Sequence, residues 1–343
     1  MALPEVTVTD DAVLWNAFVA SHPQATQYHQ HEWPALLARS FNHRAIPLAA
    51  LRGGRVVGVL PLVLMESWLF GRFLVSLPYV NYGGVLGETE EVEQALWDRT
   101  VEMAREERAA YFEARHVSPH PFIPLRKQHK VTMVLDLAPT IEAQWEAFDP
   151  KLRNQIRKAE RSGLTARMGG ASDLPDFYDV FARNMRDLGT PVYGRRFFDE
   201  VLRAFPEAAR VFSVLSGRTV IAAGIALVYR DTLEVPWAAS LREFRSMCPN
   251  NMLYWHLIQS AIKEGFRRFD FGRSTPGEGT FNFKEQWGAQ PVPLAWEYWL
   301  PNSQPLPDLS PKNAKYQMAI QIWKRLPLPV TKWLGPSIVR GIP

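Results

Sequence analysis

The feature that most limits the fold of this chain is an order of elements that occurs twice. In each copy, two stretches with the apolar spacing of a helix precede two apolar strands joined by a glycine turn. A further strand, a helix and a short strand follow. The segments are residues 11–21, 30–40, 47–65, 73–80, 91–108 and 109–115 in the first copy, and 173–188, 195–205, 211–229, 233–240, 250–265 and 267–273 in the second. Such a repeat predicts two related domains.

The spacing within the two copies is also similar. The turns at Gly54 and Gly217 lie 163 residues apart, and the strands that start at Tyr111 and Phe269 lie 158 apart. The element order predicts an α/β fold with mixed sheets, in which helices cover both faces, rather than a regular doubly wound sheet. We expect a first domain over residues 1–148, a second over 149–303 and a C-terminal extension over 304–343. The alternative is a chance alignment of hairpins and helices.

Composition excludes several classes of protein. The one cysteine, Cys248, rules out a disulfide framework and every multi-cysteine metal site, and it suits a reducing, cytoplasmic setting. The N-terminus lacks the pattern of a signal peptide. The longest apolar runs, residues 56–65 and 220–229, are far shorter than the roughly 20 residues of a membrane-spanning helix.

Positive charge is concentrated at the C-terminus. The whole chain has a net charge of +4, whereas residues 309–343 carry six cations and no acid: Lys312, Lys315, Lys324, Arg325, Lys332 and Arg340. Together with Trp323 and Trp333, these cations suit peripheral contact with the inner face of an anionic membrane. The alternative is that the extension packs its tryptophans on the first domain.

A basic helix is predicted between the two copies. Asp149 suits its N-cap, Pro150 its first position and Gly163 its exit. Three arginines recur every four residues and form one stripe, opposite a narrow apolar side; the stripe is Arg153, Arg157 and Arg161, and the apolar side is Leu152, Ile156 and Ala159. The stripe either binds an anion such as a phosphate or is a solvated face.

The densest polar and glycine-rich stretch is residues 271–288, FGRSTPGEGTFNFKEQWG. It follows a predicted strand and supplies Arg273 and Ser274 as donors to an oxyanion or a phosphate. Phe281 and Phe283 alternate with polar residues, so we expect this part to be extended, with Lys284 projecting away from the core. A lysine so placed stabilises negative charge that develops during acyl or phosphoryl transfer.

Metal-binding and nucleophile patterns are weak. His116 and His120 have the spacing of ligands on a helix, but Pro119 and Pro121 interrupt any helix there and no carboxylate pattern completes a site. Cys248 precedes a predicted helix, yet no histidine is spaced to activate it. Complete Walker, GxGxxG and GxSxG motifs are absent from the sequence. We therefore predict no metal ion and no cofactor.

Three segments taken together resemble the FemAB family of peptidyltransferase-like proteins: LRNQIRKAERSG, PNNMLYW, and the run from FDFGRS to FNFKEQWG. Their order and spacing are most similar to FemAB-like proteins associated with exosortase and exopolysaccharide loci. The resemblance implies two tandem GNAT-like (N-acetyltransferase-like) domains. It also implies transfer of an aminoacyl group from aminoacyl-tRNA to an amine of a peptidoglycan precursor, without metal or cofactor.

The resemblance also implies roles for residues. The family's motif lysine corresponds by position to Lys284, which would stabilise the tetrahedral oxyanion. Asp270, Tyr254 and the substrate's own phosphate are the candidate bases. The candidate substrate-binding residues are Lys151, Arg153, Arg157, Tyr193, Trp237, Asn250, Arg273, Ser274 and Trp287.

One segment departs from ordinary N-acetyltransferases. These hold the CoA pyrophosphate in a glycine-containing turn before a helix, and this chain has RSMCPNNML there. Pro249 and Asn250 can still begin a helix whose amides meet an anion, but the backbone approaches less closely without glycine. The donor is thus aminoacyl-tRNA or acyl-CoA, and the acceptor a phosphorylated or lipid-linked glycan or peptide. The alternative is a non-catalytic protein that binds a phosphorylated glycan.

Overall fold

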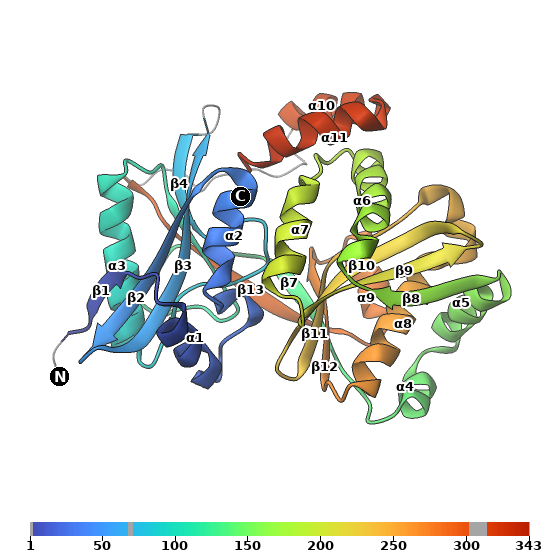
Figure 1. Cartoon of the computed structure of the whole chain (residues 1–343), viewed down its shortest axis with the longest axis horizontal. Helices are drawn as coiled ribbons and strands as arrows, with labels where there is room; N and C mark the ends of the chain where they lie inside the picture. The colour runs from blue at the N-terminus through green and yellow to red at the C-terminus, as the bar shows by residue number, and fades with distance from the viewer. Residues whose placement is uncertain (1–2, 68–70, 302–313, 343) are drawn as a thin grey trace. The chain divides into compact units, whose positions relative to one another are not determined.

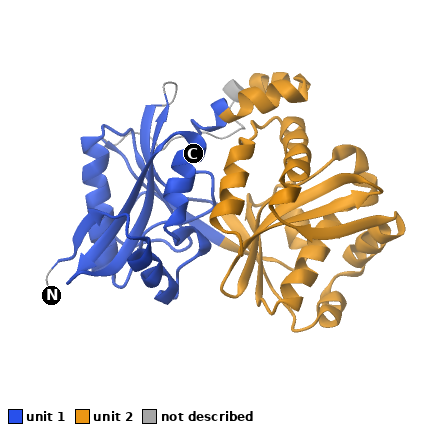
Figure 2. Cartoon of the chain, in the orientation of Figure 1, with its two compact units in different colours: residues 1–129, 293–309, 337–343 blue, residues 130–292, 310–336 orange. Residues whose placement is uncertain are grey.

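The chain divides into two compact units, seen in a computed structural model that describes residues 3–67, 71–301 and 314–342 (Figures 1 and 2). Unit 1 contains Met1–His129, Pro293–Leu309 and Ser337–Pro343, and unit 2 contains Lys130–Val292 and Ser310–Pro336. This grouping differs from our predicted division after residue 148. The other predicted boundary, after residue 303, lies outside the described residues.

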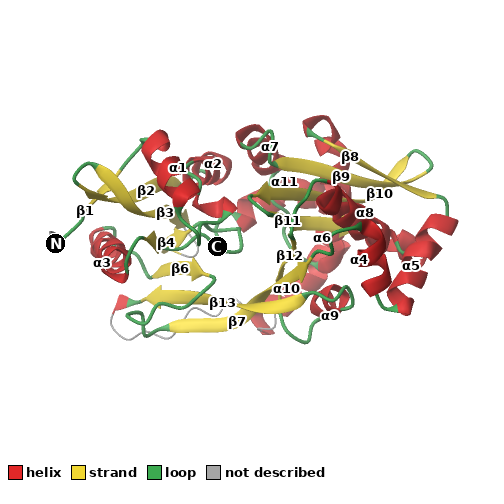
Figure 3. Cartoon of the chain, turned by 90° about the horizontal axis from the view of Figure 1, so that it is seen from below, coloured by secondary structure: helices red, strands yellow, loops and turns green. Residues whose placement is uncertain are grey.

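In unit 1 the strands follow the order β1, β2, β3, β4, β6, β13, with β5 beside β3. Their bounds are β1 (Glu5–Val8), β2 (Arg44–Arg52), β3 (Arg55–Ser67), β4 (Gly71–Ser76), β5 (Leu86–Gly87), β6 (Phe112–His116) and β13 (Gln290–Trp299). Strands β4 and β6 are parallel. Helices α1 (Ala12–Ser21) and α2 (Glu32–Phe41) lie on one face of the sheet and α3 (Glu90–Glu106) on the other (Figure 3).

Unit 2 repeats this arrangement, with the strand order β8, β9, β10, β11, β12, β7. Its strands are β7 (Arg126–Asp136), β8 (Leu164–Gly169), β9 (Ala209–Ser216), β10 (Thr219–Tyr229), β11 (Thr232–Ser240) and β12 (Arg268–Ser274). Here β11 and β12 form the parallel pair. The helices are α4 (Ile141–Ala147), α5 (Pro150–Arg161), α6 (Leu174–Leu188), α7 (Arg195–Ala204), α8 (Pro249–Lys263), α9 (Gly279–Glu285), α10 (Ala314–Arg325) and α11 (Leu328–Val339).

The predicted duplication is confirmed. The order α1, α2, β2, β3, β4, α3, β6 in unit 1 corresponds to α6, α7, β9, β10, β11, α8, β12 in unit 2. The last strand of each sheet is exchanged: β7 follows the first copy along the chain but pairs with β12, and β13 follows the second copy but pairs with β6. This exchange explains why unit 1 ends at His129, within β7, and resumes at Pro293, within β13.

Helix α5 forms as its sequence predicts. Asp149 caps it by accepting a hydrogen bond from the Lys151 amide at 2.7 Å, and Pro150 occupies its first turn. Gly163 follows with φ of 72°, a conformation that favours glycine. The residues of its narrow apolar side are buried in the core of unit 2 with strands and α8; they are Leu152, Ile156 and Ala159.

The extended conformation that we expect around Lys284 is wrong. Residues Gly279–Glu285 form the short helix α9. Two phenylalanines in alternation fit a strand, but the tertiary contacts favour a helix: Phe283 packs against Tyr254 and Trp287, while Lys284 turns inward and is buried. Four residues of alternation are too few to outweigh such packing.

Gly84 is a position where unit 1 has no room for a side chain. A Cβ atom there would lie 2.1 Å from His116 Cδ2 and 2.9 Å from the backbone oxygen of Arg115. We therefore expect Gly84→Ala to lower the free energy of unfolding by about 3 kcal/mol, the upper end of ordinary overpacking. Urea denaturation followed by circular dichroism measures this. Gly170→Ala is the control, because nothing lies within 4 Å of its Cβ position; equal effects of the two changes would contradict the prediction.

Candidate functional site

Strands β11 and β12 separate partway along their length. Their parallel pairing covers only Thr232–Glu234 and Arg268–Asp270, although β11 continues to Ser240 and β12 to Ser274. Beyond the last pair, Glu234 with Asp270, the two strands no longer pair with each other. Such a separation leaves an opening in a sheet where an extended ligand can lie against the backbone of a strand.

Lys284 is held beside this opening. It is only 7% exposed, and its Nζ donates hydrogen bonds to the backbone oxygens of Gly272 at 2.8 Å and Arg273 at 2.9 Å. An ammonium has three N–H groups, so these bonds leave one N–H for a further acceptor. Burial lowers the pKa of Lys284 to about 8, although the negative charge of Asp270 opposes this shift. Lys284 is therefore mostly a cation at neutral pH.

Asp270 shapes the strand that Lys284 contacts. Its buried carboxylate accepts hydrogen bonds from the Thr132 hydroxyl and, at 2.7 Å, from the Gly272 amide. Between Asp270 and Arg273 the register with β7 shifts by one residue, a β-bulge in which Gly272 has φ of 74°. The bulge lets two successive carbonyls face Lys284. These contacts make Asp270 a positioning group for the lysine.

Glu234 is a second buried carboxylate here that the sequence reasoning missed. It is 4% exposed, is the register partner of Asp270 and, like Asp270, favours the charged form of Lys284. In the sequence, its only sign is that Glu234 is an acidic residue within the otherwise apolar strand LEVPW. Ser274, a predicted substrate-binding residue at the end of β12, is 4% exposed, and its hydroxyl has no hydrogen-bond partner among the described residues. A ligand oxygen would satisfy it.

Tyr254 lies in an aromatic cluster rather than at a polar site. Its ring centroid is 5.2 Å from that of Phe271 and 5.3 Å from that of Phe283. Burial raises the pKa of the Tyr254 phenol, so it stays protonated at neutral pH. The geometry therefore gives no support to Tyr254 as a base, and it leaves only the role of proton donor.

A pocket of about 770 Å³ lies on the other side of α9. Two predicted substrate-binding residues, Lys151 and Trp287, line it, together with Asn251, the neighbour of the predicted Asn250. The Trp287 side chain is buried, and its indole N–H has no partner among the described residues. Lys284 is not part of the lining, whereas its neighbours Phe283 and Glu285 are.

The remaining predicted residues lie elsewhere in unit 2. Arg157 is exposed on α5, with its guanidinium 5.3 Å from the centre of the Trp145 ring, and Arg153 is half-buried with an unpartnered Nε within the described chain. Tyr193 and Trp237 belong to another aromatic cluster: each packs against Phe197 and Phe198. The structure thus brings together Lys284, Asp270, Arg273 and Ser274, and it places Trp237 on the part of β11 that no longer pairs with β12.

The corresponding helices α8 and α3 differ at their N-termini. Helix α8 begins after Cys248, which has φ of 58°, with no side-chain cap and no acid in its first turn. Helix α3 is capped by Thr89 and has three acids in its first turn, Glu90, Glu91 and Glu93. Because a helix N-terminus attracts anions unless acids occupy it, only the α8 end suits a phosphate group.

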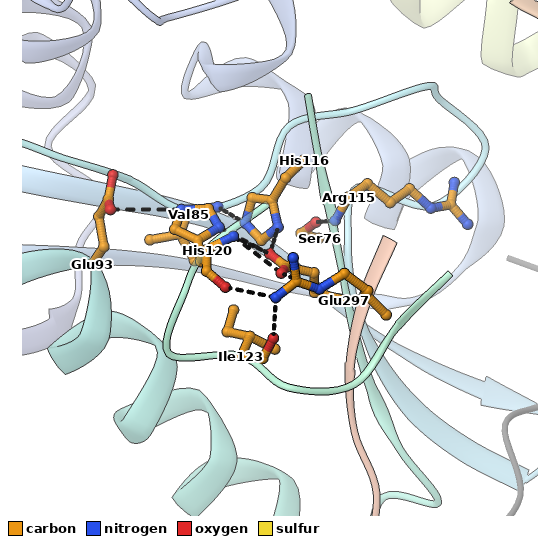
Figure 4. A network of polar contacts seen from close by, with 9 residues as sticks. Ser76, Val85, Glu93, Arg115, His116, His120, Ile123 and Glu297 are labelled. Carbon is orange, nitrogen blue, oxygen red and sulfur yellow. Dashed lines mark hydrogen bonds and ion pairs between the residues drawn. The ribbon is translucent and has the colours of Figure 1, made fainter. Parts of the chain in front are cut away.

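Unit 1 contains a buried polar network around Glu297 that joins β13 to β6 (Figure 4). Both His116 Nδ1 and His120 Nδ1 lie 2.9 Å from Glu297 Oε2, and the His120 amide donates to the same carboxylate. Our expectation that no carboxylate accompanies these histidines is wrong, because Glu297 is 177 residues from His120 in the sequence. On the far side of His120, its Nε2 lies 3.6 Å from Glu93 Oε2.

The side chains of His116, His120 and Glu297 have the composition of a metal site. The Val85 amide donates to His116 Nε2 at 2.9 Å, which places the proton of the neutral imidazole on Nδ1, beside Glu297. That nitrogen then has no lone pair for a metal. Burial alone would raise the pKa of Glu297, but its histidine partners outweigh burial and hold the pKa at about 2.

Comparison with known proteins supports the assignment of the fold. Residues 149–285 match the sequence profile of an acetyltransferase domain of the GNAT type. This region contains α5, the separated strands and Lys284. A search of curated protein sequences gave no match. No helix in the described part of the chain has the length and hydropathy needed to span a membrane.

Solved structures resemble the whole chain. The structure of FemX has 15% identity and a TM-score of 0.64, and the match covers 94% of this chain and all of that one. A tandem GNAT protein from the clavulanic acid biosynthesis pathway has 15% identity, a TM-score of 0.56 and coverage of 89% and 100%. L-PGS from Bacillus licheniformis has 13% identity, a TM-score of 0.54 and coverage of 93% and 99%. The chain therefore has a FemAB-like fold of two tandem GNAT-like domains.

Proposed function

We propose that this protein is a cytoplasmic acyltransferase of the FemAB-like kind, in which unit 2 transfers an acyl or aminoacyl group to an amine. The observation that carries the proposal is the buried Lys284 beside the opening between β11 and β12, within the segment that matches a GNAT acetyltransferase domain. The acceptor is an amine of a cell-envelope or exopolysaccharide precursor, the class that the resemblance to proteins of exosortase loci implies.

The chemistry follows from the charges at the opening. The amine nitrogen attacks the acyl carbonyl, and the carbonyl oxygen becomes an oxyanion, which the remaining N–H of Lys284 stabilises. The intermediate collapses when the new C–N bond is kept and the donor oxygen or sulfur leaves, taking a proton. The proton lost by the amine passes to a carboxylate or to the substrate's phosphate; Glu234 and Asp270 are the buried carboxylates nearest to these steps.

Aminoacyl-tRNA and acyl-CoA are the two candidate donors. The α8 N-terminus favours a phosphate group of either, but Pro249 has no amide N–H and Cys248 stands where ordinary N-acetyltransferases have a glycine turn. These departures favour aminoacyl-tRNA. The GNAT match favours acyl-CoA as the second candidate, and a related structure is described as a tandem GNAT protein without AcCoA. Arg153 and Arg157 suit the phosphates of a donor or an acceptor.

Donor binding distinguishes these candidates. We expect the protein to bind charged tRNA more tightly than uncharged tRNA at equal salt, because counterion release contributes equally to both. Arg157→Gln should weaken binding of either tRNA, whereas Arg203→Gln, a change of an exposed arginine on α7 paired with Asp199, should not. Tighter binding of acetyl-CoA would instead establish the second candidate. Binding of a phosphorylated glycan alone, with neither donor bound, would contradict the proposal in favour of a non-catalytic protein.

A further inference from the structure

Helices α10 and α11 present apolar side chains to solvent on the side that faces away from α6. In α10, Met318 is 74% exposed and Ile322, one turn later, 57% exposed. In α11, Trp333 is 77% exposed. Exposed side chains of this size in neighbouring helices mark a surface that contacts something else. We call Met318, Ile322, Arg325 and Trp333 the tail surface.

The packing of the two helices explains why these residues point outward. Helix α10 rests on the end of α6, where its Ile320 meets Gly189, and its Trp323 is buried. Residues 318 and 322 each lie two positions from Ile320, about 200° around a helix, so they face the opposite way. Arg325, three residues after Ile322, is exposed on the same side.

Helix α11 packs against α6 and against the residues that follow it. Gly335 packs against Val192, and Lys332 forms an ion pair with Asp179 of α6 and lies over the Tyr178 ring. Trp333 falls between the buried Thr331 and Gly335, two residues from each, and so points away from α6. Both helices therefore place their exposed apolar side chains on the side opposite α6. The ribbons of α10 and α11 lie beside the end of α6 in Figure 1.

The positive charge of the C-terminal segment indicates which partner the tail surface contacts. The segment from 309 to 343 contains six lysine or arginine residues and no acid, and one of them, Arg325, is exposed on the tail surface. Lysine is depleted in the cores of protein interfaces, whereas cations around an exposed tryptophan are what an anionic bilayer surface attracts. We propose that the tail surface docks the protein on an anionic membrane, with Trp333, Met318 and Ile322 entering the headgroup region.

Co-sedimentation with vesicles tests this proposal on the full-length protein. We expect pelleting with vesicles of phosphatidylcholine and phosphatidylglycerol in equal parts, and little with phosphatidylcholine alone. The variant Met318→Ser/Ile322→Ser/Trp333→Ser should bind the anionic vesicles about tenfold more weakly or worse. Arg325→Gln should weaken binding by about fivefold, the effect of one cation near an anionic surface.

The matched control removes three exposed apolar side chains from unit 1. Leu3→Ser/Val13→Ser/Leu14→Ser changes residues that are 78%, 79% and 45% exposed, and it should leave vesicle binding unchanged. Absence of pelleting by the unaltered protein, or an equal loss in the control, would overturn the proposal. A dimer in light scattering that the tail variant abolishes, without vesicle binding, would overturn it in favour of a second copy of the chain.

Discussion

Replacing Lys284 by alanine is expected to lower turnover roughly 100- to 1,000-fold, the usual loss for one donor to an oxyanion. The ammonium is buried and makes two hydrogen bonds to backbone oxygens, which leaves one N–H for the oxyanion in a site of low dielectric constant. Because Lys284 interacts with the oxyanion only in the transition state, kcat should fall while donor binding changes little.

Controls separate this effect from unfolding. Lys284→Ala also leaves the carbonyls of Gly272 and Arg273 without their donor, which costs about 1–3 kcal/mol of stability. Turnover is therefore measured at a temperature where circular dichroism shows the variant folded. Lys263→Ala, at the exposed end of α8, is the matched control. Full activity of folded Lys284→Ala would remove the lysine from the mechanism.

The pH dependence gives an independent readout of the same lysine. Its pKa is lowered to about 8, so Lys284 loses its proton as the pH rises through about 8. Only the protonated form donates with a positive charge, and turnover should therefore fall above that pH once the amine acceptor is saturating. A rate that keeps rising from pH 8 to pH 9 would contradict a role for the charged lysine.

Glu297→Gln is expected to lower the free energy of unfolding by about 3 kcal/mol, because it replaces a fully buried carboxylate, a charged hydrogen-bond acceptor, by a neutral amide whose NH2 cannot accept. Two imidazoles and a backbone amide converge on this side chain, and it links β13 to the rest of unit 1. The exposed Glu102, paired with Arg99 on α3, provides the control, since surface pairs contribute about 0–1 kcal/mol. Urea denaturation measures both variants.

Acid should weaken the same network in the unaltered protein. The pKa of Glu297 is lowered to about 2 in the folded state, so its contribution is complete above its ordinary pKa and is lost as the pH falls toward 2. Burial lowers the pKa of His116 to about 4, so the unfolded chain binds a proton first as the pH falls below 6.5. Both shifts lower stability in acid, and Glu297→Gln should flatten the profile between pH 4.5 and 2. An unchanged profile would contradict this account.

Local signals in the sequence predict much of the fold. The glycine turns, the apolar hairpins and the caps of α5 are encoded within a few residues, and the structure has them where they are predicted. The exchange of β7 and β13 is not predictable in this way. Both strands follow their own copy along the chain, and only the pairing of distant segments decides which sheet each completes.

The candidate site shows the same limit. Lys284 stands out in its motif, but its inward orientation depends on carbonyls of a bulge 11 and 12 residues earlier. Glu234 becomes noticeable only when β11 is set beside β12, and Glu297 only when β13 is set beside β6. The contacts of Tyr193 and Trp237 with Phe197 are likewise not visible in the sequence, because they join separate elements.

Detection of a transferred acyl group tests the central claim most directly. The protein is incubated with a charged tRNA pool or acyl-CoA and with amine acceptors, including amino sugars and peptidoglycan-type peptides, and the products are analysed by mass spectrometry. The account predicts an acceptor whose mass rises by that of the carboxylic or amino acid minus one water, at a rate that depends on Lys284. Donor and acceptor that bind but remain unchanged, with equal results for the unaltered protein and Lys284→Ala, would contradict it.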